Sequence, residues 1–405
     1  MNGIRAALVS YGNPRDIASW SGIPFHMLRV LESRFDIALV IEKPWASWFA
    51  PLGRVLKAAT LRRFQYNASA WFTRAASAQS RAALKAARPD VVFAVSTFSM
   101  AHALTADHRV INIADSTVRQ MIGYYDSFTH NIGGGARAAD AIEAKAIREA
   151  FLSLYPSSWA RDSAINDYGA EPDRTLNIAW GSNMTGRATI ARSLPTGPVR
   201  LLFVGAEWER KGGPMAIDIA NALAARGVAC QLDIVGADAV VLNGATDREA
   251  PGSAEIVFHG FLRKSNSADA AKLDALFADA TFFLLPTRAE CFGIVFAEAA
   301  ALGLPVVSIA TGGVTSAVRS EVTGLLLPLT ASASEFADAI TDITRTPGRY
   351  AAMSQAAIND ARDRLDWDVW ADEVEVAVRA RLESVSRETI PTSDQAPHQS
   401  ILRPD

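Results

Sequence analysis

The stretch that decides the fold is residues 281–309, which read TFFLLPTRAECFGIVFAEAAALGLPVVSI. The apolar runs at 281–285 and 305–309 predict two buried strands. The apolar stretch between them begins near Gly293 and is interrupted at Gly303, which predicts a buried helix. A strand, a helix and a second strand in this order predict a parallel α/β unit.

The same alternation of strands and helices extends over the rest of the chain. In the first half, strands are expected at 4–10, 36–41, 90–95, 110–113 and 151–155. In the second half, they are expected at 199–204, 231–235, 255–259, 281–285, 305–309 and 324–327. The pattern predicts an α/β protein with two doubly wound, Rossmann-like parallel-sheet domains that face each other across a cleft.

The chain has 405 residues, which is too long for a single hydrophobic core. We expect an N-terminal domain at 1–185, a linker rich in turn formers at 186–198, and a C-terminal domain at 199–365. A further helix at 366–385 should cross back to the N-terminal domain. The polar residues 386–405 predict a disordered tail.

The composition excludes several classes of protein. A hydrophobic fraction of 49%, a charged fraction of 20% and a net charge of -3 describe an ordinary globular protein with no bias toward nucleic acid. Cys230 and Cys291 have no companion at metal-ligand or redox-motif spacing, so a reducing compartment is expected. The first ten residues resemble a strand and its turn, which differs from a signal peptide, so we expect a cytoplasmic protein.

Two acids, Glu290 and Glu298, lie around the predicted start of a helix at Gly293. The first N–H groups of a helix have no partner within it, and the helix dipole adds positive potential there, so phosphate or sugar oxygens can bind. Two carboxylates beside such a site suit a polyhydroxylated ligand. The alternative is that Glu290 caps the helix and Glu298 is incidental, although a core-facing acid without a partner is costly.

Two cations, Arg210 and Lys211, follow the predicted strand that ends at Gly205. Positive charge is unfavourable at a helix start unless an anion neutralises it, so the pair is consistent with a bound diphosphate. The alternative is a pair of solvated surface cations. A third element, the turn at Gly22 after the first strand, either contacts a ligand or is an ordinary strand-to-helix turn.

Taken together, these residues resemble the family 4 retaining glycosyltransferases of GT-B architecture, from Ile4 to about Glu383. The resemblance rests on motifs that agree in order and spacing. These are the Glu-x7-Glu segment with its Phe-Gly, the Arg-Lys-Gly after a Val-Gly strand end, Thr311-Gly312-Gly313, and Ala179-Trp180-Gly181-Ser182-Asn183.

The resemblance implies roles for individual residues. Glu298 would bind the nucleotide ribose, and Glu290 would face the donor sugar. Lys211 and Arg210 would hold the diphosphate, and 260–262 would contact the base. The donor-binding residues implied in this way are Gly22, Gly205, Gly260, Phe261, Leu262, Cys291, Phe292, Gly293, Ile294, Val295 and Glu298, and the catalytic residues are Glu290, Arg210, Lys211 and Asp115.

The chain departs from the family pattern at two positions. Ala206 stands where the family often has Arg, and Arg210 could substitute for it. Asp115 stands where many relatives have a sugar-contacting His. Asp115 could bind a sugar hydroxyl or help activate the acceptor, and a role as a helix cap or Asx-turn is equally compatible with its position.

No cofactor and no metal are expected. The Asp-x-Asp sequence at 366–368 resembles a metal motif, but its acids also suit the first turn of a helix, and we interpret it in that way.

Residues 43–89 form a basic segment. It contains no acid, and its tryptophan and phenylalanine side chains are interleaved with Lys43, Arg54, Lys57, Arg62, Arg63, Arg74, Arg81, Lys85 and Arg88. Such a segment fits peripheral contact with an anionic membrane, at the inner face of the cell membrane, or contact with a phosphorylated or lipid-linked acceptor. The alternative is a solvated helix face.

The sequence therefore predicts a retaining, metal-independent, hexosyltransferase-like enzyme of polysaccharide biosynthesis. It would move a sugar from a nucleoside-diphosphate sugar to a hydroxyl of a glycan, glycolipid or lipid-linked saccharide, bound on the side of the N-terminal domain. The alternatives are a sugar-nucleotide epimerase and a catalytically silent protein that binds sugar nucleotides.

Overall fold

A computed structural model describes residues 3–42, 73–75, 77–96, 98–129, 135–184, 186–238 and 253–388. The N-terminal half forms a parallel sheet of order β2-β1-β3-β4-β5-β6. Its strands are β1 (Arg5–Ser10), β2 (Asp36–Ile41), β3 (Val91–Val95), β4 (Val110–Ile113), β5 (Leu152–Tyr155) and β6 (Thr175–Asn177). The central strands β3, β4 and β5 are buried along their whole length, as expected for a sheet covered on both faces.

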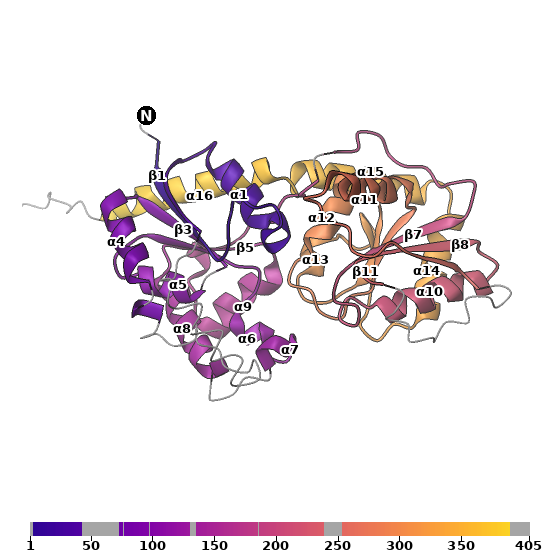
Figure 1. Ribbon diagram of the computed structural model, residues 1–405, viewed down its shortest axis with the longest axis horizontal. Coiled ribbons are helices and arrows are strands. Elements are labelled where there is room, and N and C mark those ends of the chain that lie inside the picture. Colours follow the sequence, from indigo (N-terminus) through magenta and orange to yellow (C-terminus); the bar gives the residue numbers. More distant parts are fainter. Residues whose placement is uncertain are drawn as a thin grey trace, which may run out of the picture.

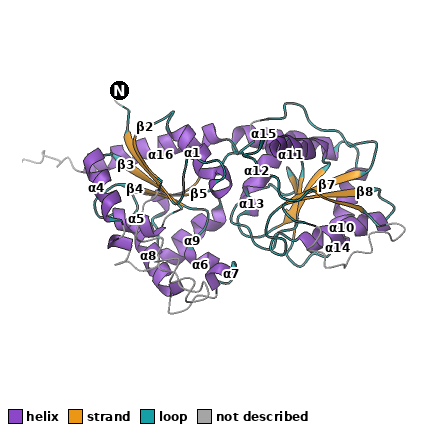
Figure 2. Ribbon diagram, viewed as in Figure 1, coloured by secondary structure: helices purple, strands orange, loops and turns teal. Residues whose placement is uncertain are grey.

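Helices cover both faces of this sheet (Figure 2). They are α1 (Ile23–Leu31), α4 (Ala78–Ala87), α5 (Phe98–Leu104), α6 (Val118–Met121), α7 (Asp126–Thr129), α8 (Gly135–Glu149) and α9 (Ser158–Tyr168), with short 3-10 turns at Ser19–Gly22 and Pro172–Arg174. Helix α6 begins with a capping box between Thr117 and Gln120.

The C-terminal half repeats the plan with the order β12-β11-β10-β7-β8-β9. Its strands are β7 (Val199–Val204), β8 (Cys230–Val235), β9 (Glu255–Phe258), β10 (Phe282–Leu285), β11 (Val306–Ile309) and β12 (Gly324–Leu327). Its helices are α10 (Gly213–Ala225), α11 (Ser267–Asp279), α12 (Ile294–Ala301), α13 (Val314–Ala317), α14 (Ala333–Arg345) and α15 (Arg349–Asp363). The quoted stretch 281–309 thus forms β10, α12 and β11.

The last helix joins the two halves. Helix α16 (Trp367–Glu388) leaves the C-terminal half and runs along the N-terminal half beside α1 (Figure 1). Arg34 donates to Asp372 at 2.7 Å. The rings of Trp180 and Phe292 meet edge to face across the domain boundary, with centroids 5.8 Å apart. One apolar core therefore continues from one domain into the other.

The two Rossmann-like parallel-sheet domains that the sequence predicts are confirmed. Two details differ from the prediction. The short edge strand β6 was not predicted, because three residues carry too little pattern. Helix α16 extends to Glu388, beyond the expected end at 385, where Ser386 donates to the Leu382 carbonyl and Arg387 lies 3.6 Å from Glu383. The expected tail from 389 onward and most of the basic segment lie outside the described residues.

Candidate active site

A cavity of about 1040 Å³ lies between the two domains, where the carboxyl ends of strands from both sheets meet. The N-terminal domain contributes the segments that follow β1, β3 and β4. The C-terminal domain contributes 204–211, 263–265 and the segment 290–298. This is the usual position of a ligand site in open α/β sheets, and the volume is at the upper end of the range for small-molecule pockets.

Glycine brings the loops of the C-terminal domain close together. Gly212 has a φ of +79°, and a Cβ there would lie 2.0 Å from the Pro286 carbonyl oxygen. A Cβ on Gly313 would lie 1.7 Å from the Cys291 carbonyl oxygen. Any side chain at either position would push these loops apart. The turn before α10 can therefore approach the loop after β10.

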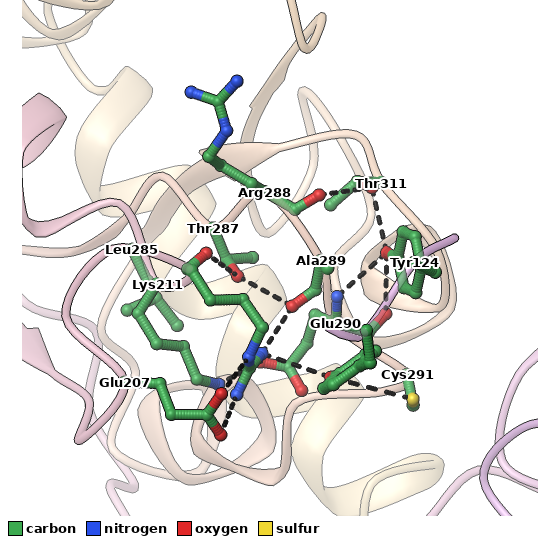
Figure 3. Close-up of polar contacts among 12 residues, drawn as sticks. Tyr124, Glu207, Lys211, Leu285, Thr287, Arg288, Ala289, Glu290, Cys291 and Thr311 are labelled. Atoms are coloured by element: carbon green, nitrogen blue, oxygen red, sulfur yellow. Dashed lines mark hydrogen bonds and ion pairs between the residues drawn. The ribbon is translucent and has the colours of Figure 1, made fainter. Parts of the chain in front are cut away.

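The first ionic cluster joins Glu290 to two cations. Lys211 forms an ion pair with Glu290 Oε2, and Arg210 Nη1 lies 3.9 Å from the same oxygen. Arg210 also donates to both carboxylate oxygens of Glu207, at 2.7 and 2.8 Å, and to the Ala289 carbonyl at 2.6 Å. Figure 3 shows Lys211, Glu207 and Glu290 converging on one point. The side chains of Lys211 and Glu290 are 14% and 10% exposed, so the pair is largely shielded from water.

The second ionic cluster is the pair of Lys264 and Glu298. Glu298 lies in α12 with its side chain 4% exposed, and Lys264 donates to its Oε1. Lys264 and its neighbour Arg263 follow β9, just as Arg210 and Lys211 follow β7. Four basic residues of the C-terminal domain therefore line the cavity.

The start of α12 lies between these two clusters. Gly293 is the N-cap, with a φ of +79°, and no side chain caps the helix. Because the first N–H groups of a helix lack partners within it, they present donors and positive potential to the cavity. The cavity wall here consists of 290–295. A phosphate or sugar oxygen would find both backbone donors and cations.

The wall from the N-terminal domain carries two acids, Asp115 and Glu143. Burial, together with the charge of Glu290, raises the pKa of Asp115 to about 6, against which a hydrogen bond from Ser116 acts. Burial raises the pKa of Glu143 to about 8, although the Val118 N–H donates to its carboxylate at 2.5 Å. At pH 7, Glu143 is therefore mostly protonated, whereas Asp115 is mostly ionised and takes up a proton as the pH falls through about 6. The helix cap that Asp115 could have provided is Thr117.

Cys291 is a buried thiol in the same cavity. Its sulfur lies 3.6 Å from the sulfur of Met121 and 3.8 Å from the hydroxyl of Tyr125, both from the N-terminal domain. Burial raises the pKa of the Cys291 thiol well above its ordinary value, with the charges of Asp115 and Glu290 acting in the same direction. A thiol held neutral in this way is a poor nucleophile. Its carbonyl and backbone shape the loop.

The structure brings most of the predicted site residues together. All four residues predicted as catalytic, Glu290, Arg210, Lys211 and Asp115, line the cavity, and so do Gly205, Glu298 and 291–295. The position of the two cations differs slightly from the prediction. Arg210 and Lys211 lie in the turn before α10, which begins at Gly213.

Four predicted residues do not line this cavity. Gly22 packs under the side chain of Asn183 as the N-cap of α1. The Gly260 carbonyl accepts from the Gly236 N–H at 2.8 Å, which holds it at the sheet edge. The side chain of Phe261 is 60% exposed, and Leu262 packs against the apolar core. Their neighbours 263–265 reach the cavity instead.

The sequence reasoning missed several lining residues. Arg263 and Lys264 had a usable signal, because a cation pair directly after a strand is the feature that identified Arg210 and Lys211. Glu143 and Tyr125 lie in or beside helices and carry no local signal of a site. Among the residues that the structure describes, no group of three or more His, Cys, Asp and Glu side chains could hold a metal ion.

Residues 198–346 match the family model described as Glycosyl transferases group 1. The C-terminal domain is thus similar to the domains of glycosyl transferases group 1. This match covers β7 to α14, the region that holds both ionic clusters.

Curated relatives and solved structures agree with this assignment. A D-inositol 3-phosphate glycosyltransferase 1 from Catenulispora acidiphila is 28% identical over 261 residues, which are 61% of this chain and 58% of the relative. The chain thus spans little more than half the length of this relative.

Sucrose-phosphate synthase from Thermosynechococcus elongatus has a TM-score of 0.65 at 17% identity, covering 94% of this chain and 99% of that one. Anabaena HepE in complex with UDP-glucose has a TM-score of 0.61 at 16% identity, covering 93% and 100%. These likenesses show the GT-B fold, with its two facing Rossmann-like domains, along almost the whole described chain.

Proposed function

We propose that this protein is a retaining glycosyltransferase of family 4 that moves a sugar from a nucleoside-diphosphate sugar to a hydroxyl acceptor. One observation carries the proposal. In the interdomain cavity, the uncapped start of α12 lies between two buried carboxylates, each ion-paired to a lysine. The relatives named as glycosyltransferases and the fold shared with a UDP-glucose complex support the same reading.

In the proposed reaction, the bond between the sugar C1 and the diphosphate oxygen breaks as the acceptor oxygen bonds to C1 from the same face. The acceptor proton passes to the departing phosphate oxygen. Lys211, Arg210 and the first N–H groups of α12 would stabilise the negative charge that develops on the diphosphate. Neither glutamate has to act as an acid or a base.

The two carboxylates would bind hydroxyl groups of the donor. Glu290, in the loop before α12, would face the sugar, and Glu298, one helical turn further in, would bind the ribose. Asp115 lies on the opposite wall and would contact the acceptor or the sugar. The acceptor, a glycan, glycolipid or lipid-linked saccharide, would enter along the N-terminal domain.

Location and metal use belong to the proposal as well. None of the helices within the described ranges is long and apolar enough to cross a membrane. We propose a cytoplasmic enzyme that contacts the inner face of the cell membrane through the basic segment Lys43 to Arg88 and needs no metal for chemistry. A sugar-nucleotide epimerase is less well supported, since the similar curated proteins are named as glycosyltransferases.

The proposal is tested by incubating the protein with UDP, GDP, ADP and dTDP sugars and measuring the release of nucleoside diphosphate, with and without EDTA. One donor should be turned over, and the anomeric configuration of the product, read by NMR, should match that of the donor. Lys211→Met should reduce turnover about a hundredfold or more, because it removes a cation from the leaving group.

The matched control is Lys272→Met, which removes an exposed lysine from α11 outside the cavity. It should leave turnover unchanged. If no donor is bound, or if Lys211→Met behaves like Lys272→Met, the chain is not a transferase of this kind. Inversion of configuration would overturn the retaining assignment alone.

A further inference from the structure

We propose that Tyr124 and Tyr125, called here the tyrosine pair, are positioning residues that set Glu290 and Arg210 in place across the domain boundary. The inference rests on the proposed function. The tyrosine pair belongs to the N-terminal domain, just after α6, whereas Glu290 and Arg210 belong to the C-terminal domain. The tyrosine pair therefore links the acceptor side of the cavity to its donor side.

Tyr124 holds the loop that carries Glu290. The Glu290 N–H donates to the Tyr124 hydroxyl at 2.9 Å, and the hydroxyls of Tyr124 and Thr311 are 2.9 Å apart. Thr311 in turn donates to the Arg288 carbonyl at 3.3 Å. Figure 3 shows this chain of hydrogen bonds from Glu290 through Tyr124 to Thr311 and Arg288. One hydroxyl from the N-terminal domain thus joins the loops after β10 and β11.

The loop after β11 is shaped to admit this hydroxyl. Gly312 has a φ of +50°, and a Cβ there would lie 2.3 Å from the Tyr124 hydroxyl oxygen. Any other residue at this position would therefore block the contact. The Tyr124 ring also packs against Trp159, with centroids 5.2 Å apart, so it is supported from within its own domain.

Tyr125 orients Arg210. The Arg210 guanidinium lies 4.6 Å above the centre of the Tyr125 ring, and its Nη1 donates to the Tyr125 hydroxyl at 3.1 Å. Arg210 is also held by Glu207 and by the Ala289 carbonyl. These contacts define the orientation of the guanidinium at the cavity wall. Among the described contacts of Arg210, those with Tyr125 come from the N-terminal domain, and those with Glu207 and Ala289 come from the C-terminal domain.

The origin of these contacts determines which kinetic step they affect. A donor that binds to the C-terminal domain keeps its ion pairs and backbone donors whether or not the tyrosine pair is in place. Glu290 and Arg210 reach their final alignment only when Tyr124 and Tyr125 contact them across the domain boundary. The tyrosine pair should therefore affect turnover much more than donor affinity, which is the signature of a positioning contact.

Tyr125→Phe and Tyr124→Phe test this, since each removes a hydroxyl and keeps the ring. For each variant we expect kcat to fall about tenfold or more, which is the loss of one hydrogen bond to a charged or aligned group. The donor dissociation constant, measured by calorimetry, should change less than twofold. Tyr350→Phe is the matched control, since it removes a hydroxyl that donates to the Thr281 carbonyl away from the cavity. Its kcat should equal that of the wild type.

A second measurement needs no activity and separates this inference from the proposed function. Hydrogen exchange at the amides of 287–292 should accelerate several-fold in Tyr124→Phe and in Thr311→Val, but not in Tyr350→Phe. The double variant Tyr124→Phe with Thr311→Val should exchange no faster than either single variant, because both break the same chain.

The outcomes are distinct. If the wild type turns over no donor but the exchange results hold, the proposed function fails and the interdomain contact stands. If Tyr124→Phe and Tyr125→Phe keep full kcat, or if the exchange effects of Tyr124→Phe and Thr311→Val add, the tyrosine pair does not position the site. A rise in donor dissociation constant that accounts for the whole loss would equally overturn it, since the pair would then be a binding element.

Discussion

Replacing Lys264 by Met should expose how strongly the fold depends on pairing Glu298. The Glu298 side chain is 4% exposed within α12, and Lys264 is the cation that donates to it. Methionine keeps the apolar stem of lysine and removes the charge. Removing one partner of a buried ion pair typically costs about 3–5 kcal/mol, because the remaining charge stays desolvated.

The cost here should be smaller, because the Lys264 side chain is 34% exposed and water can partly replace it. We therefore expect a loss of about 2 kcal/mol, which is below that range because solvent screens the exposed part of the pair. For a domain of this size that corresponds to a fall in Tm of about 4–8 °C. The measurement is thermal and urea unfolding followed by circular dichroism.

Two further variants show whether charge is the cause. The double variant Lys264→Met with Glu298→Gln should recover most of the loss, since no charge is then left unpaired. Lys264→Arg should stay close to the wild type. The reasoning is refuted if the single effects of Lys264→Met and Glu298→Gln add to within about 0.5 kcal/mol in the double variant, or if Lys272→Met lowers Tm as much.

Three other predictions follow from burial in and around the cavity. Because burial raises the pKa of Glu143 from 4.5 to about 8, the native state keeps a proton that the unfolded chain loses, so the free energy of unfolding should fall as pH rises through this window. Glu143→Gln should remove that fall, which at about 1.4 kcal/mol per pKa unit amounts to roughly 4 kcal/mol by pH 8, and parallel pH curves for both proteins would contradict this. Cys291 should react with a maleimide far more slowly in the native protein than in urea, and equal rates would show the thiol to be open. Gly313→Ala should unfold at lower urea concentration than wild type, because its Cβ would meet the Cys291 carbonyl oxygen; an unchanged midpoint would contradict the close approach.

The fold could be predicted because its signals are local. A fully buried parallel strand reads as a continuous apolar run, and β10 and β11 carry that pattern with Gly303 and Pro305 between helix and strand. The edge strand β6, of three residues, carries too little pattern to detect. Helix α16 extends beyond its expected end to Glu388, where Arg387 lies 3.6 Å from Glu383, one turn earlier. This i,i+4 spacing is readable in the sequence, but the polar composition that follows it obscured the end of the helix.

The candidate site could be predicted in part for the same reason. Arg210, Lys211 and Glu290 directly follow strands, so chain position alone brings them to the carboxyl edge of one sheet. Which cation pairs with which acid depends on how three loops approach one another, and sequence spacing does not contain that information. The site residues that the N-terminal domain contributes were harder still to predict from the sequence. Tyr124 reaches the loop after β10 through the arrangement of two domains, across 166 residues of sequence.

The ion pairs give a physical reason why this site would select a sugar nucleotide over a bare phosphate. Lys211 and Lys264 are each already satisfied by a buried carboxylate. An anion that took Lys264 would leave Glu298 without its cation, and one that took Lys211 would leave Glu290 with only Arg210, 3.9 Å away. Both carboxylates are shielded from water, so that penalty would offset the gain. A ligand that carries hydroxyl groups next to its phosphates can donate hydrogen bonds to both carboxylates while its phosphates bind the lysines. Under the proposed function, the glutamates would therefore act as selectors as well as contacts, because they make diphosphate binding favourable when a sugar and a ribose come with it.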